Sequence, residues 1–188
     1  MPNIDVILTH DNVTLRPYRL SNAEAALEGI RESLPELLPW MPWAHPDYPL
    51  KEVRDYIKRS NENWKDGVAR EFAIFDKQDG VYLGGCGLNQ IDRENRMANL
   101  GYWVRTSQTG KGIATTAALL LAEFGFTKLS LNRIEILVAV GNMRSQRVAA
   151  KVGASREGML RNRLNIRGTI HDAVMFSLVP EDLEKPVT

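Results

Sequence analysis

Residues 102–120 read YWVRTSQTGKGIATTAALL, in which a strand leads through a polar turn with two glycines directly into an apolar helix. A helix start leaves about four backbone N–H groups without partners and carries a partial positive charge. The two glycines, Gly110 and Gly112, let the backbone approach an anion without a side-chain clash. This stretch therefore predicts a pyrophosphate-binding turn at the start of the helix.

Two common phosphate-binding loops do not fit this stretch. The loop of nucleoside-triphosphate-binding proteins requires Gly, four residues, and then Gly-Lys-Ser/Thr. Here Arg105 stands five residues before Gly110, and Gly112 follows Lys111. The dinucleotide pattern needs a third glycine three residues after the second, where this chain has Thr115. A different pyrophosphate carrier is therefore expected.

A third pattern fits the turn: a small or polar residue, two residues, Gly, one residue, and then Gly or Ala. The run Thr109-Gly110-Lys111-Gly112-Ile113-Ala114 satisfies it. This run resembles the coenzyme A pyrophosphate loop of the GCN5-related N-acetyltransferase (GNAT) superfamily. That family prefers Gln or Arg where this chain has Thr109, and Gln108 stands one residue earlier. Taken alone, the run also fits a tight turn with a helix cap, so support has to come from elsewhere in the chain.

Segments spread along the chain add to this resemblance. In their order and spacing they look like the branch that acetylates N-termini of ribosomal proteins, the RimJ/RimL-like branch. The resemblance covers roughly residues 12–180. The segments are LRP at 15–17, LPWMPW at 38–43, ANLGYWV at 98–104, LNRIE at 131–135, AVGNMRS at 139–145 and KVGA at 151–154.

Length and composition point to one soluble domain. We expect a single domain over residues 1–188 with its core at about 12–180. Twenty-four Lys and Arg balance 23 Asp and Glu, which gives no electrostatic reason to expect a nucleic-acid partner. The single Cys86 excludes an intramolecular disulfide, and the three scattered histidines do not have the spacing of a metal site. Because no signal peptide or membrane-spanning stretch is evident, a cytoplasmic protein without a membrane partner is expected.

The order of predicted elements favours a mixed α/β sheet. The resemblance implies the GNAT arrangement: a mostly antiparallel mixed sheet of about seven strands, splayed at the coenzyme A site and flanked by about four helices. Five prolines between Pro35 and Pro49 are expected to interrupt helical structure there. Strands are predicted at 13–18, 71–76, 81–90, 96–105, 133–140, 155–166 and 169–179, and helices at 21–32, 50–64, 112–129 and 142–152.

The resemblance implies acetyl-CoA as the cosubstrate and no metal. Backbone N–H groups from Gly110 to Ala114 would hold its pyrophosphate, and Lys111 could add positive charge. The strand end at Val104 would pair with the pantetheine arm through its backbone. The residues implied in cosubstrate binding on the strand, the turn and the helix start are Val104, Thr109, Gly110, Lys111, Gly112, Ile113 and Ala114.

Asn142 and Ser145 stand three residues apart near a helix start and so share one face. The resemblance implies that Asn142 contacts the pantetheine arm and that the Ser145 hydroxyl reaches the coenzyme sulfur. A departing thiolate needs a proton or a hydrogen-bond donor, which makes Ser145 the candidate catalytic residue. Asn142 could equally serve as a helix cap, and the two roles are compatible.

The acceptor would be an amine that attacks the thioester directly. The resemblance suggests Trp40, Trp43, Asn89 and Tyr102 as substrate-binding residues. Relatives can have Glu where this chain has Asn99 and Leu164, so the general base is open. An α-amine, with a pKa near 7.7–8.0, needs less help from a base than a lysine near 10.4. A peptide or protein N-terminus is therefore the expected acceptor.

Two alternatives stay open at this point. One is a non-catalytic sensor module that binds acyl-CoA, because both familiar carboxylate positions lack a carboxylate. The other is an acetyltransferase for a small amine or an antibiotic, because fold and cosubstrate do not determine the acceptor. A homodimer is also compatible with the sequence.

Overall fold

The computed structural model describes residues 6–183, so the parts of the expected domain at 1–5 and 184–188 lie outside the described residues. Eight strands form one sheet in the order β1-β2-β3-β4-β5-β6-β8-β7. Every neighbouring pair is antiparallel except β5 and β6, which run parallel. The predicted mixed α/β fold is therefore confirmed. The strands are β1 (Leu8–His10), β2 (Val13–Pro17), β3 (Arg70–Asp76), β4 (Tyr82–Asp92), β5 (Met97–Val104), β6 (Arg133–Ala139), β7 (Ser155–Ile166) and β8 (Thr169–Leu178).

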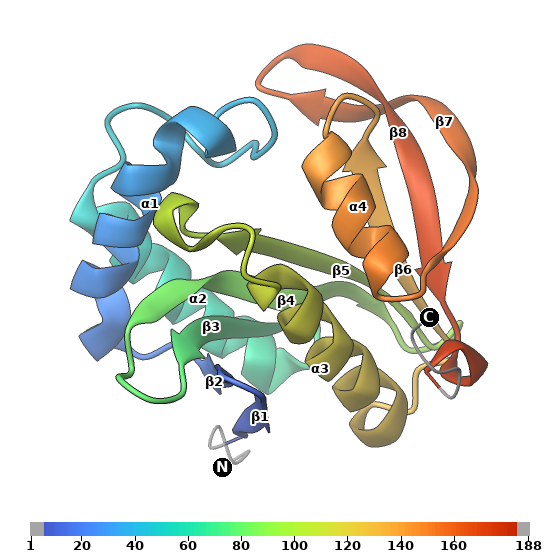
Figure 1. Cartoon of the computed structure of the whole chain (residues 1–188), viewed down its shortest axis with the longest axis horizontal. Helices are drawn as coiled ribbons and strands as arrows, with labels where there is room; N and C mark the ends of the chain where they lie inside the picture. Colours follow the sequence, from blue (N-terminus) through green and yellow to red (C-terminus); the bar gives the residue numbers. More distant parts are fainter. Residues whose placement is uncertain (1–5, 184–188) are drawn as a thin grey trace.

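Four α-helices cover the two faces of the sheet (Figure 1). Helices α1 (Ala23–Leu37) and α2 (Leu50–Asp66) pack on one face. Helices α3 (Ile113–Lys128) and α4 (Met143–Lys151) pack on the other. Three short 3-10 turns complete the chain: η1 (Leu20–Asn22), η2 (Thr106–Gln108) and η3 (Pro180–Asp182).

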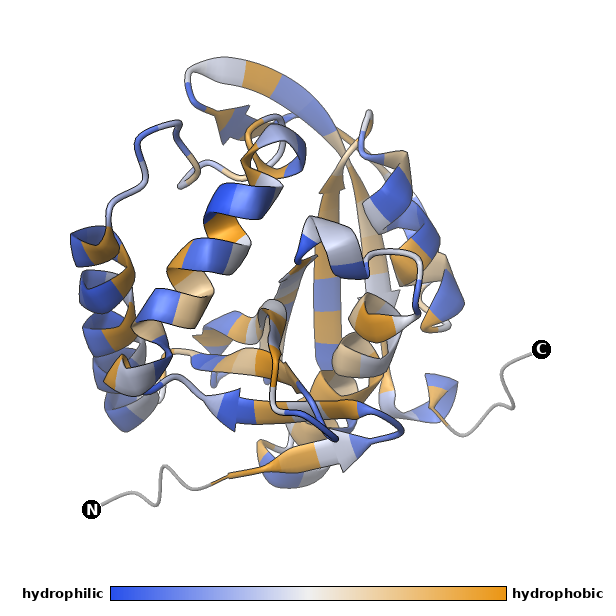
Figure 2. Ribbon diagram, turned by 60° about the vertical axis from the view of Figure 1, so that its left-hand side comes forward, coloured by the Kyte–Doolittle hydropathy of each residue, from blue (hydrophilic) through white to orange (hydrophobic). Residues whose placement is uncertain are grey.

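The helices bury different amounts of their surface because their apolar patterns differ. Helix α1 buries Ala23, Ala26 and Ile30 along one stripe, with polar residues on the opposite side. Helix α3 is apolar around most of its surface and packs against the centre of the sheet, where Figure 2 shows hydrophobic residues along the strands. Its Leu121 and the strand residue Leu88 are fully buried in the same cluster. Helix α3 is therefore deeply packed, as its apolar sequence requires.

The parallel pair β5–β6 is hydrogen-bonded over a short length. Its register joins Met97 to Arg133, Ala98 to Ile134 and Asn99 to Glu135, and goes no further. Beyond this point β5 stays with β4 as far as Val104, and β6 stays with β8 as far as Ala139. The two strands therefore separate in the middle of the sheet, which confirms the predicted splay.

Two details differ from the predictions. Strand β1 was not predicted, because its three residues are too few to show a clear alternation. Helix α1 was expected to end near residue 32, yet it continues through Pro35 to Leu37. A proline removes its own N–H bond, but the next turn still closes, since the Leu38 N–H donates to the Leu34 carbonyl at 2.9 Å.

An ion-pair network ties the last three strands of the sheet together. The Arg133 guanidinium on β6 donates to both oxygens of Glu157 on β7, each at 2.6 Å. The Ser177 hydroxyl on β8 donates to the same carboxylate at 2.6 Å. The hydrogen bonds from Arg133 and Ser177 lower the pKa of Glu157 to about 2.

We predict that Glu157→Gln destabilises the protein by about 1–2 kcal/mol at pH 7, after allowance for solvent screening of a partly exposed pair. The pKa of Glu157 is lower in the folded protein, so its stabilisation is present at neutral pH. That stabilisation is lost as the pH falls from about 5 to about 2. Urea unfolding across this range should show the two proteins converging. Glu123→Gln, an exposed control, should follow the wild type throughout, and a Glu157→Gln deficit that stays constant with pH would contradict the assignment.

Candidate active site

The turn between β5 and α3 leaves a row of backbone N–H groups without protein acceptors. Gly110 and Gly112 have φ angles of +80° and +79°, which L-residues rarely adopt. Within residues 6–183, no N–H from Gly110 to Thr115 donates a hydrogen bond to another residue. A side-chain carbon at either glycine would meet no atom within 4 Å, so the space above the turn is open. The turn can therefore accept an anion, as the sequence predicts.

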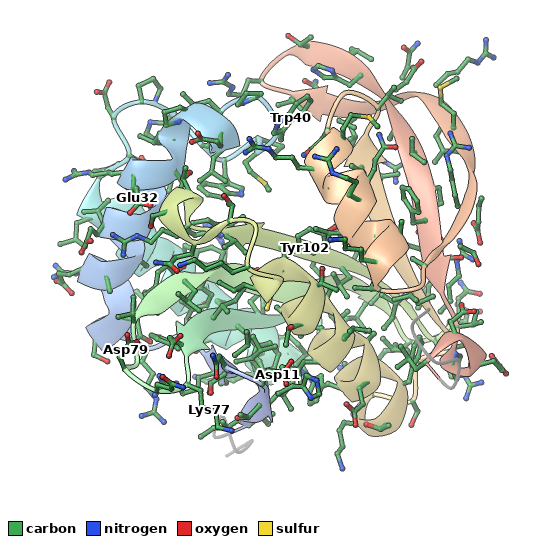
Figure 3. The ribbon with its side chains drawn as sticks, in the orientation of Figure 1. Asp11, Glu32, Trp40, Lys77, Asp79 and Tyr102 are labelled. Carbon is green, nitrogen blue, oxygen red and sulfur yellow. The ribbon has the colours of Figure 1, made fainter. Side chains whose placement is uncertain are left out.

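Helix α1 holds this turn in place. The buried Ser33 hydroxyl accepts a hydrogen bond from the Thr106 N–H at 3.0 Å and donates to the Gly29 carbonyl at 2.7 Å. Glu32, labelled in Figure 3, accepts from the Ser107 N–H at 2.8 Å and pairs with Arg105. The start of the turn is thus anchored to a helix on the opposite face of the sheet.

Two side chains predicted to bind the cosubstrate are used within the turn itself. The Thr109 hydroxyl donates to the Thr106 carbonyl at 2.9 Å, which closes η2. The exposed Lys111 ammonium donates to the Gln108 side-chain oxygen at 2.8 Å. The main chain, more than these side chains, is available to a ligand here.

A pair of hydroxyls lies where β5 faces α4. The Tyr102 hydroxyl donates to the Ser145 carbonyl at 3.0 Å, and its oxygen lies 3.1 Å from the Ser145 Oγ. Asn142 caps α4, because its Oδ1 accepts from the Ser145 N–H at 3.1 Å. Burial raises the pKa of Tyr102 to about 12, so the phenol stays protonated at neutral pH. The structure brings together three predicted site residues, Asn142, Ser145 and Tyr102, and the Tyr102 hydroxyl, predicted for substrate binding, lies against Ser145.

A cavity of about 590 Å³ runs through the region where β5 and β6 separate. Six of the predicted site residues line it, from both faces of the sheet, whereas the residues of the glycine turn do not. The six are Trp40, Trp43, Asn89, Tyr102, Asn142 and Ser145.

Aromatic side chains form the wall of the cavity beyond Ser145. Trp40 packs over Gly141, where an added side-chain carbon would lie 3.0 Å from the indole. Figure 3 shows Trp40 between the end of α1 and α4, and Tyr102 deeper in the molecule beside β5. Trp43 stacks at a tilt on Trp103, with ring centroids 6.1 Å apart. The segment that contains Trp40 and Trp43 therefore forms one wall of the cavity.

Comparison with known proteins identifies the family of the chain. A family model described as an acetyltransferase (GNAT) domain matches residues 12–155. The chain is 33% identical over 172 residues to the Bacillus licheniformis protein named "Uncharacterized N-acetyltransferase p20", covering 92% of this chain and 95% of that protein. It is 31% identical to "Putative ribosomal N-acetyltransferase YdaF" of Bacillus subtilis, covering 93% and 95%. The structure of Mycobacterium smegmatis RimJ in complex with CoA-disulfide aligns with a TM-score of 0.83 at 29% identity, covering 93% of this chain and 85% of that chain.

The chain belongs to the GNAT acetyltransferase family. It is an acetyl-CoA-dependent N-acetyltransferase, and the coenzyme A expected from the glycine turn is its cosubstrate. Among residues 6–183 there is no cluster of His, Cys, Asp or Glu that could hold a metal ion. No helix in the described part of the acetyltransferase has the length and apolarity needed to cross a membrane.

The acetyltransferase cavity also contains residues that the sequence did not single out as site residues. Tyr18, Tyr56, Tyr82 and Glu71 all line it. Each comes from the region before residue 90, and each was expected to be an ordinary strand or helix residue. Strand pairing brings Glu71 of β3 beside β4, which contains Tyr82, whereas Tyr56 comes from α2 and Tyr18 follows the end of β2.

We predict that Ser33→Ala loosens the glycine turn of the acetyltransferase. The change leaves the Thr106 N–H without its acceptor, which should lower the free energy of unfolding by about 1–3 kcal/mol. Amide hydrogen exchange at Thr106 and Ser107 should accelerate. Ser60→Ala is the matched control, because Ser60 is buried on α2; exchange in the turn should stay at the wild-type rate. Equal protection of the turn in both variants would show that Ser33 does not anchor it.

Proposed function

We propose that this acetyltransferase moves the acetyl group of acetyl-CoA to the α-amine of a peptide or protein N-terminus, of the ribosomal-protein type. The observation that carries the proposal is the cavity through the β5–β6 gap. It extends from the Tyr102–Ser145 hydroxyl pair to the aromatic wall at Trp43. A chain end can enter from the aromatic side and bring its terminal nitrogen to the gap. The name of the Bacillus subtilis relative, a ribosomal N-acetyltransferase, supports the same class of acceptor.

Backbone groups would hold the cosubstrate. The N–H groups of Gly110, Lys111, Gly112, Ile113 and Ala114 would bind the pyrophosphate, because they lack protein acceptors. The edge of β5 that ends at Val104 faces the gap without a β6 partner and would pair with the pantetheine amides. Asn142 stands beside this edge, in the wall of the cavity.

Acetyl-CoA supplies the acetyl group as an activated thioester. The acceptor nitrogen attacks the carbonyl carbon, and the sulfur leaves as a thiolate that needs a proton. Ser145 would donate it. The Tyr102 phenol, which is protonated and lies 3.1 Å from the Ser145 Oγ, would turn its proton from the Ser145 carbonyl to that oxygen and so replace the proton on Ser145. Trp40, Trp43 and Asn89 would surround the acceptor.

Amine basicity favours the α-amine over lysine. At pH 7 roughly a tenth of an α-amine is neutral, against about 0.04% of a lysine side chain. The difference corresponds to about 3 kcal/mol of extra cost for lysine. Neither Asn99 nor Leu164, both in the cavity wall, can act as a base. A site without a strong base at these positions suits the less basic amine.

An acceptor screen tests the proposal. We expect acetyl-CoA turnover, followed by release of free coenzyme thiol, to be faster with peptides that have a free N-terminus than with other amines. The same peptides with a blocked N-terminus and one internal lysine are the matched control, and spermidine represents small amines. Faster turnover with the blocked lysine peptides or with spermidine would overturn the N-terminal assignment.

We predict that Ser145→Ala lowers kcat by up to about 100-fold at saturating substrates, because the thiolate loses its proton donor. Tyr102→Phe should lower kcat less, and the double variant should lose little more than Ser145→Ala, because the two hydroxyls form one chain. The affinity for coenzyme A, measured by calorimetry, should change little in Tyr102→Phe. An unchanged kcat in Ser145→Ala would show that another group protonates the sulfur.

A further inference from the structure

The cavity wall contains a buried carboxylate oxygen that has no partner. Glu71 on β3 lines the cavity, and its Oε2 is shielded from solvent and makes no hydrogen bond within residues 6–183. The Arg16 Nε shares this property, but its guanidinium lies over the Phe75 ring and Arg16 is not a lining residue. A buried carboxylate oxygen without a hydrogen-bond donor is costly, so a ligand with a donor is the expected partner of the Glu71 Oε2.

Strand register directs Glu71 toward the β5–β6 gap. Glu71 is paired with Gly87 on β4, and Gly87 is paired with Gly101 on β5. A side-chain carbon at Gly87 would lie 3.2 Å from the Glu71 Cγ, so the glutamate extends across this glycine. At Gly101 an added carbon would meet only the Asn89 amide, at 3.9 Å. Because Gly87 and Gly101 have no side chains, the space between the Glu71 carboxylate and the edge at which β5 separates from β6 is left open.

The groups around Glu71 do not neutralise it. Tyr56 and Arg59 on α2 line the cavity near Glu71. The rest of this wall is formed by Tyr18, which follows β2, and by Tyr82 and Cys86 on β4. Burial raises the pKa of Tyr18, Tyr56, Tyr82 and Cys86. The Glu71 charge and a hydrogen bond to its carboxylate raise the pKa of Tyr56 further, so these groups stay neutral while the Glu71 Oε2 is left without a partner. Arg59 is an exposed residue at the wall, and among residues 6–183 it forms no ion pair with Glu71. The carboxylate is therefore available to a cation.

We propose that Glu71 is the catalytic group that receives the acceptor's ammonium and takes its proton. This inference rests on the proposed function, from which it takes the acceptor, the α-amine of a peptide or protein N-terminus. A carboxylate within an aromatic wall that includes Trp43 and Trp103 provides favourable surroundings for a primary ammonium. It also provides a base on the acceptor side of the gap, opposite the Tyr102–Ser145 pair.

The proton and electron balance of the step is complete. One ammonium proton passes to the Glu71 carboxylate, and the neutral nitrogen attacks the acetyl carbon. The C–N bond forms, the C–S bond breaks, and its electron pair goes to sulfur. The second nitrogen proton replaces the one that the Tyr102–Ser145 pair gives to sulfur, and Glu71 later releases its proton to solvent.

The test compares Glu71→Gln with the full-length wild type, using the best acceptor of the screen between pH 6.5 and pH 9.5. At pH 7 we expect kcat/KM to fall by about 100-fold. The deficit should shrink as the pH rises past about 8, because the acceptor then arrives already neutral. Calorimetry should give wild-type coenzyme A affinity, which shows that the variant is folded.

Two further variants sharpen the test. Glu62→Gln removes the same charge from an exposed position on α2 and should leave kcat/KM unchanged. Glu71→Asp keeps the carboxylate but retracts it, so kcat/KM should fall less than in Glu71→Gln. Wild-type kcat/KM in Glu71→Gln, or a deficit of constant size across the pH range, would overturn the role of Glu71. A wild type that prefers spermidine or lysine would overturn the N-terminal assignment alone, and the same comparison with that amine would still decide the role of Glu71.

Discussion

The site depends on the point where the parallel strands β5 and β6 stop pairing. Each strand is held away from the other by a stronger set of contacts on its far side. Strand β5 continues into a turn that Ser33 and Glu32 anchor to α1. Strand β6 keeps a continuous antiparallel register with β8 as far as Ala139. The gap is thus built into the sheet topology, and the anchoring of the turn to α1 supports it.

This constraint explains where small residues occur. Gly85, Gly87 and Gly101 lie on the cavity face of β4 and β5, and a side chain at Gly85 would collide with the Tyr18 hydroxyl at 2.3 Å. Glycine in a strand interior weakens the strand, but it leaves room for another group to approach the backbone. Here the room lies beside the gap. The stability of the sheet is supplied elsewhere, by the large buried cluster under α3.

The chemistry divides between the two faces of the sheet. The face under α4 carries the hydroxyls of Tyr102 and Ser145, which suit proton delivery to a leaving thiolate. The face under α1 and α2 carries the aromatic wall and Glu71, which suit an incoming amine. The positions of Asn99 and Leu164, where relatives can have a carboxylate, are uncharged in this chain. Glu71, on a strand two places away from β5 in the sheet, lines the same cavity as Asn99 and Leu164, because strand register and not sequence distance sets which residues lie near one another.

Local sequence determined most of the secondary structure, the glycine turn and the family, because periodicity, helix caps and positive-φ glycines act over a few residues. It also placed Asn142 and Ser145 on one helix face. Tertiary structure alone decided the rest. Helix α1 continues through Pro35, the Tyr102 hydroxyl meets Ser145 across 43 residues of chain, and Glu71 extends toward Gly101. These features depend on strand register and helix packing, which join residues far apart in the chain and leave no local pattern in the sequence.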